Sequence, residues 1–443
     1  MAQDAHNFGV PLEMEAPAGN AGYVEIAGTT GTSSLFLTIS NVVKSILGAG
    51  ILTLSWSYVF STLWPGVFFT VVMGCLSAFC FYTLGVSSEL TGESTYSGIW
   101  SKVFGVKWAP VADIVIIVYC AFSVTGYLII VGDYVPLALQ GLGVATPWLL
   151  DRHVCILITS LIILPLNFAK DLSFLGFTSI VGTVGTIYTV LVLVFELPSF
   201  GVCDTWEPFV AQPGLFVMIP AVTFAFNGHF NAPQLYQQLK ERTPSRWLLV
   251  TALSFVLCGL LTVTCSVCGY LTLGTGLLEK GHSNVLDAPQ FGGRAEVMVA
   301  YIATTFSVAL CAPLNLVCVR DGLDGLWTRN FEPRLGLQST PNTRHWTFSV
   351  IGVVFTFSMA MFFSELGTVV ALNGAVCATL IMFVFPSLMY LKCLSIAGTQ
   401  KLPLRVTLVP CTAIVIGVVV GVCGVATTSM VAFGLGNHLI WNA

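Results

Sequence analysis

The sequence predicts an all-α membrane protein with eleven transmembrane helices, on three observations. Of the 443 residues, 56% are hydrophobic and only 9% are charged, whereas about a quarter of the residues in a soluble domain are charged. The apolar residues form long runs, and about 20 in succession can cross the hydrocarbon core of a bilayer. Nearly all charged residues fall between these runs. The expected surroundings are therefore a lipid bilayer, and no basic cluster with interleaved aromatic residues suggests a nucleic-acid partner.

Polar breaks divide the chain into a tail and eleven apolar runs. The tail, residues 1–35, holds no Lys or Arg and no compact apolar stretch, so we expect a disordered segment rather than a cleavable signal peptide. The runs lie at 36–60, 66–89, 109–139, 154–168, 172–197, 214–236, 247–273, 297–319, 346–363, 366–391 and 404–433. The fourth run is short, and only two residues separate the ninth from the tenth.

The positions of Lys and Arg predict how the chain is oriented. With a cytosolic N-terminus, thirteen of these residues fall in cytosolic loops and only three, Arg152, Lys280 and Arg294, in outer loops. Positive residues are retained on the cytosolic side, so eleven helices place the C-terminus on the extracellular or lumenal side. The membrane is expected to be the plasma membrane or a vacuolar or lysosomal membrane.

The first apolar run is interrupted at its centre. Residues 40–56 read SNVVKSILGAGILTLSW, with Gly48 and Gly50 in the middle and Lys44 as the one charged residue. Glycine at membrane depth favours a helix that breaks, and a broken helix exposes backbone groups whose partial charges suit a zwitterionic ligand. The alternative is that glycine only allows two helices to approach closely.

The sixth run carries a similar interruption. Residues 220–236 read PAVTFAFNGHFNAPQLY, in which Asn227 and Gly228 are poor helix formers and prolines stand on either side. An odd number of helices between two similar elements inverts the second relative to the first, so the sequence predicts two inverted five-helix repeats. Their boundaries are 36–197 and 212–391, and an eleventh helix follows within 402–433.

Seven stretches after the tail resemble one family in their order and spacing. They include GAGILTLSW at 48–56, SVTGYLIIVGD at 123–133, FAFNGHFNAPQLYQQLKERTPSR at 224–246 and APLNLVCVRDGL at 312–323. Together they resemble the amino acid/auxin permease family, which includes sodium-coupled neutral amino acid transporters and proton-assisted amino acid transporters. The resemblance implies a LeuT-like fold with helices 1 and 6 broken, and secondary active transport by alternating access.

The resemblance also implies where the substrate binds. Backbone amides at the first break would meet the substrate carboxylate, and carbonyl groups at both breaks would hold its ammonium group. The expected substrate-binding residues are Ser45, Leu47, Gly48, Ala49, Gly50, Ile51, Phe224, Asn227 and Gly228.

Four further residues are candidates for ion coupling: Lys44, His229, Ser307 and Cys311. Sodium-coupled members of the family carry an Asn where this chain has Lys44 and a Thr where it has Cys311, whereas proton-assisted members resemble it in having Lys. An ammonium at a sodium site would repel the ion, so proton coupling or sodium independence is expected. The alternative for Lys44 is that its side chain snorkels to the cytosolic interface; for His229 it is a structural hydrogen bond rather than a proton relay.

The sequence thus predicts a transporter of small or neutral amino acids, coupled to protons or independent of sodium. The alternatives are a sodium-coupled symporter, in which carbonyl and hydroxyl groups near Ser307 bind the ion, and a sensor that binds an amino acid without transporting it. No catalytic constellation, metal-ligand spacing or cofactor motif is present in the sequence, so an enzyme is not expected. Cys155 and Cys203 would both lie near the outer face, where a disulfide between them stays open as a possibility.

Overall fold

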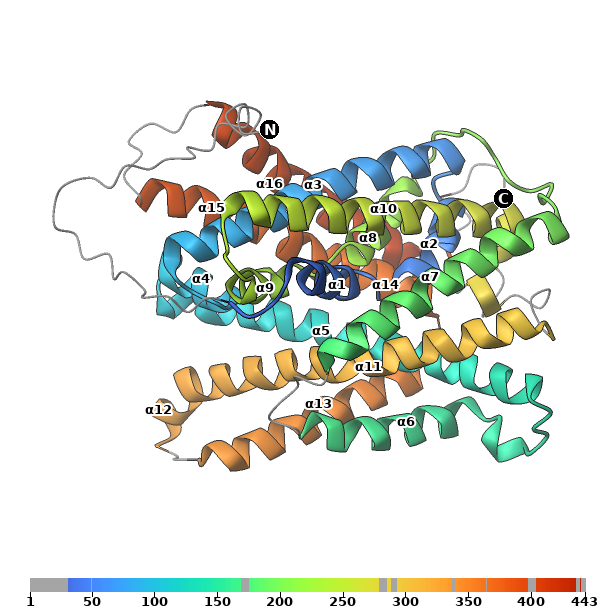
Figure 1. The fold of residues 1–443 in the computed structure, drawn as a ribbon, viewed down its shortest axis with the longest axis horizontal. Helices are drawn as coiled ribbons and strands as arrows, with labels where there is room; N and C mark the ends of the chain where they lie inside the picture. Colours follow the sequence, from blue (N-terminus) through green and yellow to red (C-terminus); the bar gives the residue numbers. More distant parts are fainter. Residues whose placement is uncertain are drawn as a thin grey trace.

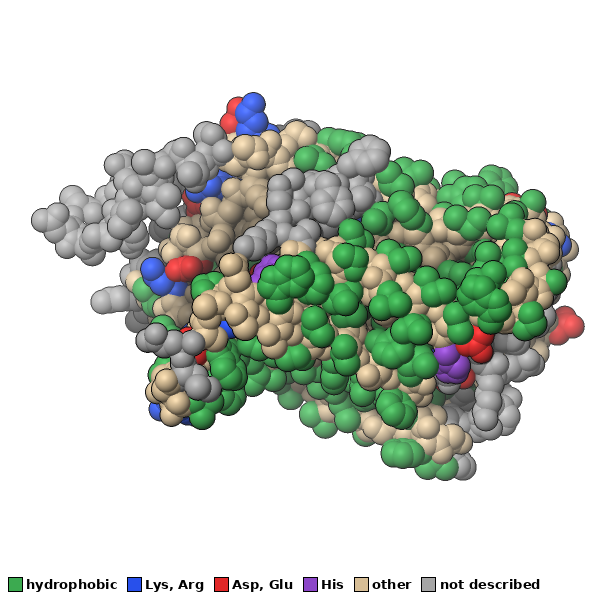
Figure 2. Space-filling view, turned by 90° about the horizontal axis from the view of Figure 1, so that it is seen from below, with side chains coloured by type: hydrophobic (Ala, Val, Ile, Leu, Met, Phe, Trp, Pro, Cys, Tyr) green, Lys and Arg blue, Asp and Glu red, His purple; other side chains and the backbone are tan. Residues whose placement is uncertain are grey.

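The computed structural model is a bundle of long helices aligned roughly with the longest axis of the molecule (Figure 1). It describes residues 31–48, 50–168, 175–278, 285–287, 293–336, 339–363, 365–396, 404–435 and 439. Ala49 and most of the predicted tail lie outside this set. On the face seen in Figure 2, hydrophobic side chains cover most of the middle, and charged side chains lie toward the two ends of the long axis. This distribution is what a bilayer around the middle of the bundle requires.

The helices follow the predicted runs closely. They are α1 Leu35–Ile46, α2 Gly50–Val59, α3 Leu63–Thr91, α4 Tyr96–Phe104, α5 Ala109–Gly141, α6 Arg152–Asn167, α7 Leu175–Phe200, α8 Leu215–Ala225, α9 Ala232–Gln238, α10 Pro244–Leu273, α11 Ala295–Leu326, α12 Glu332–Leu335, α13 Pro341–Phe362, α14 Leu366–Asn373, α15 Phe385–Ile396 and α16 Leu404–Ala432. A short 3₁₀ helix, η4, spans His229–Asn231, and π-helical turns at Gly374–Ala378 and Leu380–Val384 join α14 to α15.

Among the described residues, nine helices are long and apolar enough to cross a bilayer, and the bent pair α1 and α2 would make ten. The further predicted run corresponds to α6, a shorter apolar helix of 16 residues. The structure is therefore an all-helical, multi-pass membrane fold, and the count of eleven spans stays a prediction.

Local capping explains where several helices begin. Each of these N-cap side chains accepts a hydrogen bond from the backbone N–H three residues later: Ser34 for α1, Thr95 for α4, Asp151 for α6, Thr243 for α10 and Thr340 for α13. Such bonds satisfy amides that have no partner in the first helical turn. The helix α4 was not among the predicted elements, because its nine residues are too few to appear as a membrane span.

The helices form two groups that meet at the centre of the molecule. One, which we call the scaffold group, consists of α5, α6, α11 and α13, with α11 packed along α5 and α13 packed on both α5 and α6. The other, the core group, consists of α1 and α2, α3, α8 and α9, and α10, which contact one another extensively. The helix α7 packs against α1, α10 and α11, and so lies between the groups.

The disulfide considered from the sequence is not formed. Cys155 and Cys203 are both free thiols. The Cys155 thiol donates to the carbonyl oxygen of Leu149, 3.3 Å away, while Cys203 lies beside Thr205 and α10. Placement near the same face of the bundle did not bring the two sulfur atoms together.

Candidate functional site

The first interruption lies between α1 and α2. The backbone N–H of Leu47 still donates to Val43 in the α-helical pattern, but that of Gly48 donates to Ile46, 2.9 Å away. The helix resumes at Gly50, and the axes of the two pieces differ by 48°. The carboxyl end of α1 and the amino end of α2 therefore lie close together among buried residues, and helix ends are where backbone groups lack partners within the helix.

The second interruption lies between α8 and α9. The helix α8 ends at Ala225, after which the N–H of Asn227 donates to Phe224 at 3.2 Å and that of Asn231 donates to Gly228 at 3.1 Å. The chain then passes through η4 into α9. In both interruptions, one short helix ends and another begins within a few residues.

The two interruptions touch each other directly. A Cβ atom added at Gly50 would lie 2.8 Å from Cα of Ala225 and 3.0 Å from Cδ1 of Phe224. A Cβ atom added at Gly228 would lie 2.7 Å from Oγ of Ser45. Only glycine permits this approach of the two backbones, since real Cβ atoms do not come within 3.0 Å of such neighbours. The structure thus brings together Ser45, Gly50, Phe224 and Gly228, four of the residues expected to bind the substrate.

Two tyrosines of α5 complete the polar surroundings. The Tyr127 hydroxyl would lie 2.9 Å from a Cβ atom at Gly48, and it accepts from the amide of Asn315 on α11 at 3.4 Å. The Tyr119 hydroxyl donates to the carbonyl oxygen of Asn227 at 3.2 Å. Tyr119 and Asn315 were not predicted, because one buried Tyr or Asn in an apolar run has no sequence signal that separates it from ordinary packing.

Lys44 is buried and joins three helices. Its side chain is only 4% exposed, and its Nζ donates to both the hydroxyl and, at 3.1 Å, the carbonyl oxygen of Ser307 on α11. The Ser307 hydroxyl donates in turn to the carbonyl oxygen of Gly182 on α7, 3.2 Å away. A buried ammonium needs such partners, because its desolvation costs several kcal/mol. The alternative in which Lys44 snorkels to the interface is therefore wrong.

A small cavity opens beside the first interruption. Its lining residues come from α2, the residues before it, α7 and α11: Leu47, Gly48, Ile51, Leu52, Thr186, Thr189, Val190, Thr304, Ser307 and Val308. Its volume of about 10 Å³ is close to the minimum that holds one water molecule. Four of the lining residues carry hydroxyl groups and the other six are aliphatic residues or glycine, so this cavity is mostly apolar with a few hydroxyl groups.

His229 and Cys311 have different surroundings, the first beside α3 and α10 and the second on α11. The ring of His229 is fully buried, its Nε2 lies 3.0 Å from the carbonyl oxygen of Ser77 on α3, and its neighbours include Phe81 and Phe255. A carbonyl partner requires the proton on Nε2, which leaves Nδ1 as an acceptor. Cys311 is buried one helical turn after Ser307 and accepts, through its carbonyl oxygen, from Asn315. The hydrogen bond of His229 matches the structural alternative.

The bundle thus contains two interrupted helices in contact and the buried ammonium of Lys44 between its two groups. Interrupted helices that meet inside a multi-pass bundle are typical of secondary transporters. The family described as transmembrane amino acid transporter protein matches residues 31–430, and the chain belongs to it. It is therefore a member of an amino acid transporter family and not an enzyme. The sequence-based identification of the family is confirmed.

Curated relatives resemble the chain over most of its length. Solute carrier family 38 member 8 of Mus musculus is 25% identical over 394 residues, covering 84% of this chain and 88% of the relative. Sodium-coupled neutral amino acid transporter 7 of Danio rerio is 25% identical over 388 residues, covering 82% and 78%.

Two solved structures have the same general fold. A manganese transporter of Eremococcus coleocola has a TM-score of 0.58 and 11% identity and covers 92% of each chain. A Na⁺-coupled sialic acid symporter has a TM-score of 0.53 and 12% identity, covering 90% of this chain and 91% of its own. At such identities the likeness concerns the fold alone.

Proposed function

We propose that the protein transports small or neutral amino acids by alternating access, with the substrate bound where the two interruptions meet. The observation that carries this proposal is the direct contact of Gly50 with Ala225 and of Gly228 with Ser45. The ends of α1, α2, α8 and α9 would then surround the substrate. The amino ends of α2 and α9 carry partial positive charge, and the carboxyl ends of α1 and α8 carry partial negative charge.

A zwitterion matches this arrangement. The amides of Gly50 and Ile51, in the first turn of α2, would bind the carboxylate, with the Tyr127 hydroxyl as a further donor beside Gly48. Carbonyl groups near Ser45, Leu47 and Phe224 would accept from the ammonium group. Ala49, which lies outside the described residues, is expected to contribute its amide as well.

Coupling is proposed to run through Lys44. Its ammonium links α1 of the core group to α11 of the scaffold group. A cation at this position would hold the two groups together. Breaking that link would free α1 to move, so Lys44 would tie the movement of α1 to the coupling ion. This supports proton coupling or sodium independence, with His229, Ser307 and Cys311 in supporting roles.

Sodium coupling is the second candidate. The observation in its favour is that the Danio rerio relative is named a sodium-coupled transporter. In that case the hydroxyl groups of Thr304 and Ser307 would bind the ion beside the first interruption. The Lys44 ammonium weighs against it, because two cations a few ångströms apart in a low-dielectric site repel strongly.

The finer topology belongs to the same proposal. With α6 as the fourth span, the pairs α1–α2 and α8–α9 count as spans 1 and 6, both broken, and α16 as the eleventh. Residues 36–197 and 212–391 would then be inverted repeats, with the N-terminus cytosolic and the C-terminus extracellular or lumenal. The membrane would be the plasma membrane or a vacuolar or lysosomal membrane.

The test is uptake of labelled alanine and glutamine into proteoliposomes that hold the purified protein. We expect accumulation driven by a pH gradient and indifferent to sodium, and we expect Lys44→Asn to lose that drive. Accumulation driven only by a sodium gradient would establish the second candidate instead. Binding without accumulation under either gradient would indicate an amino acid sensor and overturn the proposal.

A further inference from the structure

The helices α1 and α9 lie side by side and run in opposite directions. The chain enters α1 at Leu35 and reaches the first interruption at Ile46, whereas α9 leaves the second interruption at Ala232 and ends at Gln238. Each helix is therefore half of an interrupted span, and both halves lie on the same side of the site. Two separate ties join them, one at each end of the pair.

The outer tie of the pair is a β-bridge just before α1. The backbone N–H of Ser33 donates to Gln238 and that of Lys240 donates to Ser33, both at 2.9 Å, so that Ser33 pairs with Leu239 in parallel. Leu239 is fully buried and Ser33 only 8% exposed. A Cβ atom at Gly31 would overlap the carbonyl oxygen of Gln238, so this segment fits closely against the chain after α9.

This segment is continuous with α1 and not a loose extension of it. The Ser33 hydroxyl is hydrogen-bonded to that of Thr38 at 2.9 Å, and the next residue, Ser34, caps α1 through the N–H of Leu37. Residues 31–34, which we call the strap, therefore transmit any movement of α1 to the residues that follow α9. The sequence did not predict the strap, because a short polar segment before a helix carries no signal for a β-bridge.

The inner tie lies at the interruptions. The amide Nδ2 of Asn231 donates to Oγ of Ser45 at 2.9 Å, and the backbone of Gly228 packs against the same serine. In contrast, the one polar contact described from α1 to the scaffold group is that of Lys44 with Ser307. Polar ties thus hold α1 to α9 at both ends, while a single side chain holds α1 to α11.

We infer that α1 and α9 form one gating unit, joined by the strap and by Asn231, which moves as a single body when the site opens on that side. The inference rests on the proposed alternating access, and it specifies that α1 and α9 are the elements that move together. Asn231 is then a positioning residue, because it keeps the ends of the two interruptions in register through Ser45. A gate made of α1 alone would have to break both ties in every cycle.

A disulfide across the strap tests this. Residues paired across a bridge lie about 5 Å apart, which is within the Cα separation of a disulfide, so the variant Ser33→Cys/Leu239→Cys is oxidised in proteoliposomes. We expect the oxidised protein to take up alanine at the rate of the reduced protein, within about twofold. Loss of uptake on oxidation with recovery on reduction would overturn the inference, as would failure of the disulfide to form. Single-cysteine variants control for the other thiols.

A second measurement does not depend on the buried position 239. Spin labels at Ser34→Cys and Lys240→Cys report the distance across the strap, and labels at Ser34→Cys and Asp321→Cys report the distance to the scaffold group. We expect the first distance to stay unchanged on adding alanine and a pH gradient while the second changes. A change in the first distance would contradict the gating unit. Absence of uptake by the native protein would instead count against the proposed function.

Discussion

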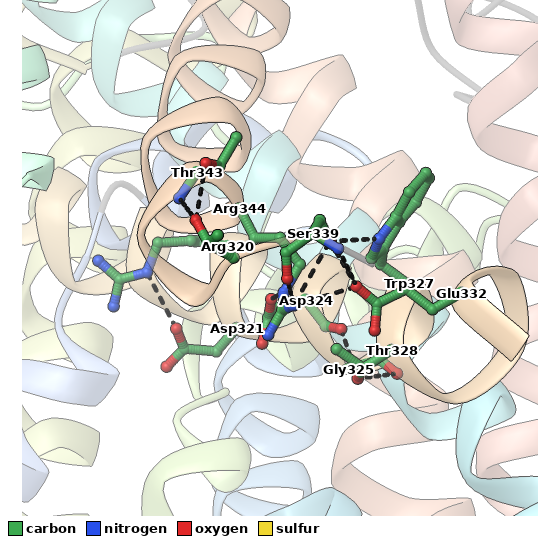
Figure 3. A network of polar contacts seen from close by, with 11 residues as sticks. Arg320, Asp321, Asp324, Gly325, Trp327, Thr328, Glu332, Ser339, Thr343 and Arg344 are labelled. Carbon is green, nitrogen blue, oxygen red and sulfur yellow. Dashed lines mark hydrogen bonds and ion pairs between the residues drawn. The ribbon is translucent and has the colours of Figure 1, made fainter. Parts of the chain in front are cut away.

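Two regions of the molecule are stabilised by different kinds of contact: the turn between α11 and α13 by ion pairs, and the contact between the two interruptions mostly by neutral groups. At the turn, Arg344 pairs with both Asp324 and Glu332, and Ser339 and Trp327 join the same network (Figure 3). At the interruptions, the contacts are glycine backbones, neutral hydrogen bonds and one buried ammonium. Many-membered charged networks fix geometry, whereas a few neutral contacts can be broken and remade.

The two regions therefore differ in how freely they can move. The scaffold group carries a second clamp, in which Arg329 pairs with Asp113 of α5, so its helices are tied to one another by ions. The core group meets the scaffold group through packing, through Lys44 and through the neutral hydrogen bond from Tyr119 to the carbonyl oxygen of Asn227. An account in which the core group moves and the scaffold stays fixed predicts large functional effects at the interruptions and small ones at the turn.

The largest effect is expected at Gly228. In Gly228→Val the added side chain would overlap Ser45 and force the two interruptions apart, so uptake should fall by more than about 100-fold. The matched control is Gly259→Ala on α10, where an added Cβ atom meets nothing within 4 Å. Both variants are compared by initial rates of alanine uptake, after size-exclusion chromatography shows equal monodispersity. Normal uptake by Gly228→Val would mean that the contact is not part of the site.

A smaller effect is expected at Lys44. Lys44→Met removes the ammonium but keeps an unbranched side chain, so pH-driven accumulation should fall by about tenfold or more while downhill exchange of alanine persists. The pair of measurements separates coupling from binding. Equal loss of exchange and accumulation would show that Lys44 supports the fold or the substrate and not coupling.

Removing one hydroxyl at the site should have a moderate effect. Tyr127→Phe keeps the ring and deletes a donor beside Gly48, and a lost hydrogen bond to a charged group costs about 1.5–3 kcal/mol. The KM for alanine should therefore rise by about tenfold or more with the maximal rate little changed. Tyr134→Phe, farther along the same helix, is the control. An unchanged KM in Tyr127→Phe would remove this hydroxyl from the carboxylate site.

The smallest functional effect is expected at the turn. Arg344→Gln breaks the network with Asp324 and Glu332, so the Tm should fall by a few degrees in a thermal unfolding assay. Uptake at a temperature well below the Tm should change by less than about twofold. A strong loss of uptake with an unchanged Tm would show that the turn takes part in the transport cycle.

The sequence indicated most of the long helices and the helix-breaking residues within two of the runs, because hydrophobic runs and helix-breaking residues are local signals. Glycines at 48 and 50 and the Asn-Gly pair at 227 and 228 reveal a weak point in a helix without knowledge of its neighbours. Even so, only the fold shows why position 228 needs a glycine, which is its close contact with Ser45.

The partners of these residues could not be predicted, because they are remote in the chain. Lys44 and Ser307 are 263 positions apart, and the choice between snorkelling and a buried bond depends on which helix packs on α1. The strap and the ion pair of Arg329 with Asp113 also join residues that lie far apart in the sequence. A disulfide between Cys155 and Cys203 was considered from their shared face, but a shared face does not fix the distance between two sulfur atoms.

The central claim is that helix ends at the paired interruptions recognise both charges of an amino acid. It is tested most directly by competition against the best-bound labelled amino acid, using that amino acid, its carboxamide and its N-acetyl derivative on purified protein. The account predicts competition by the free amino acid alone, with each derivative weaker by at least about tenfold, since each removes one charge-assisted interaction. Equal competition by all three compounds would contradict it.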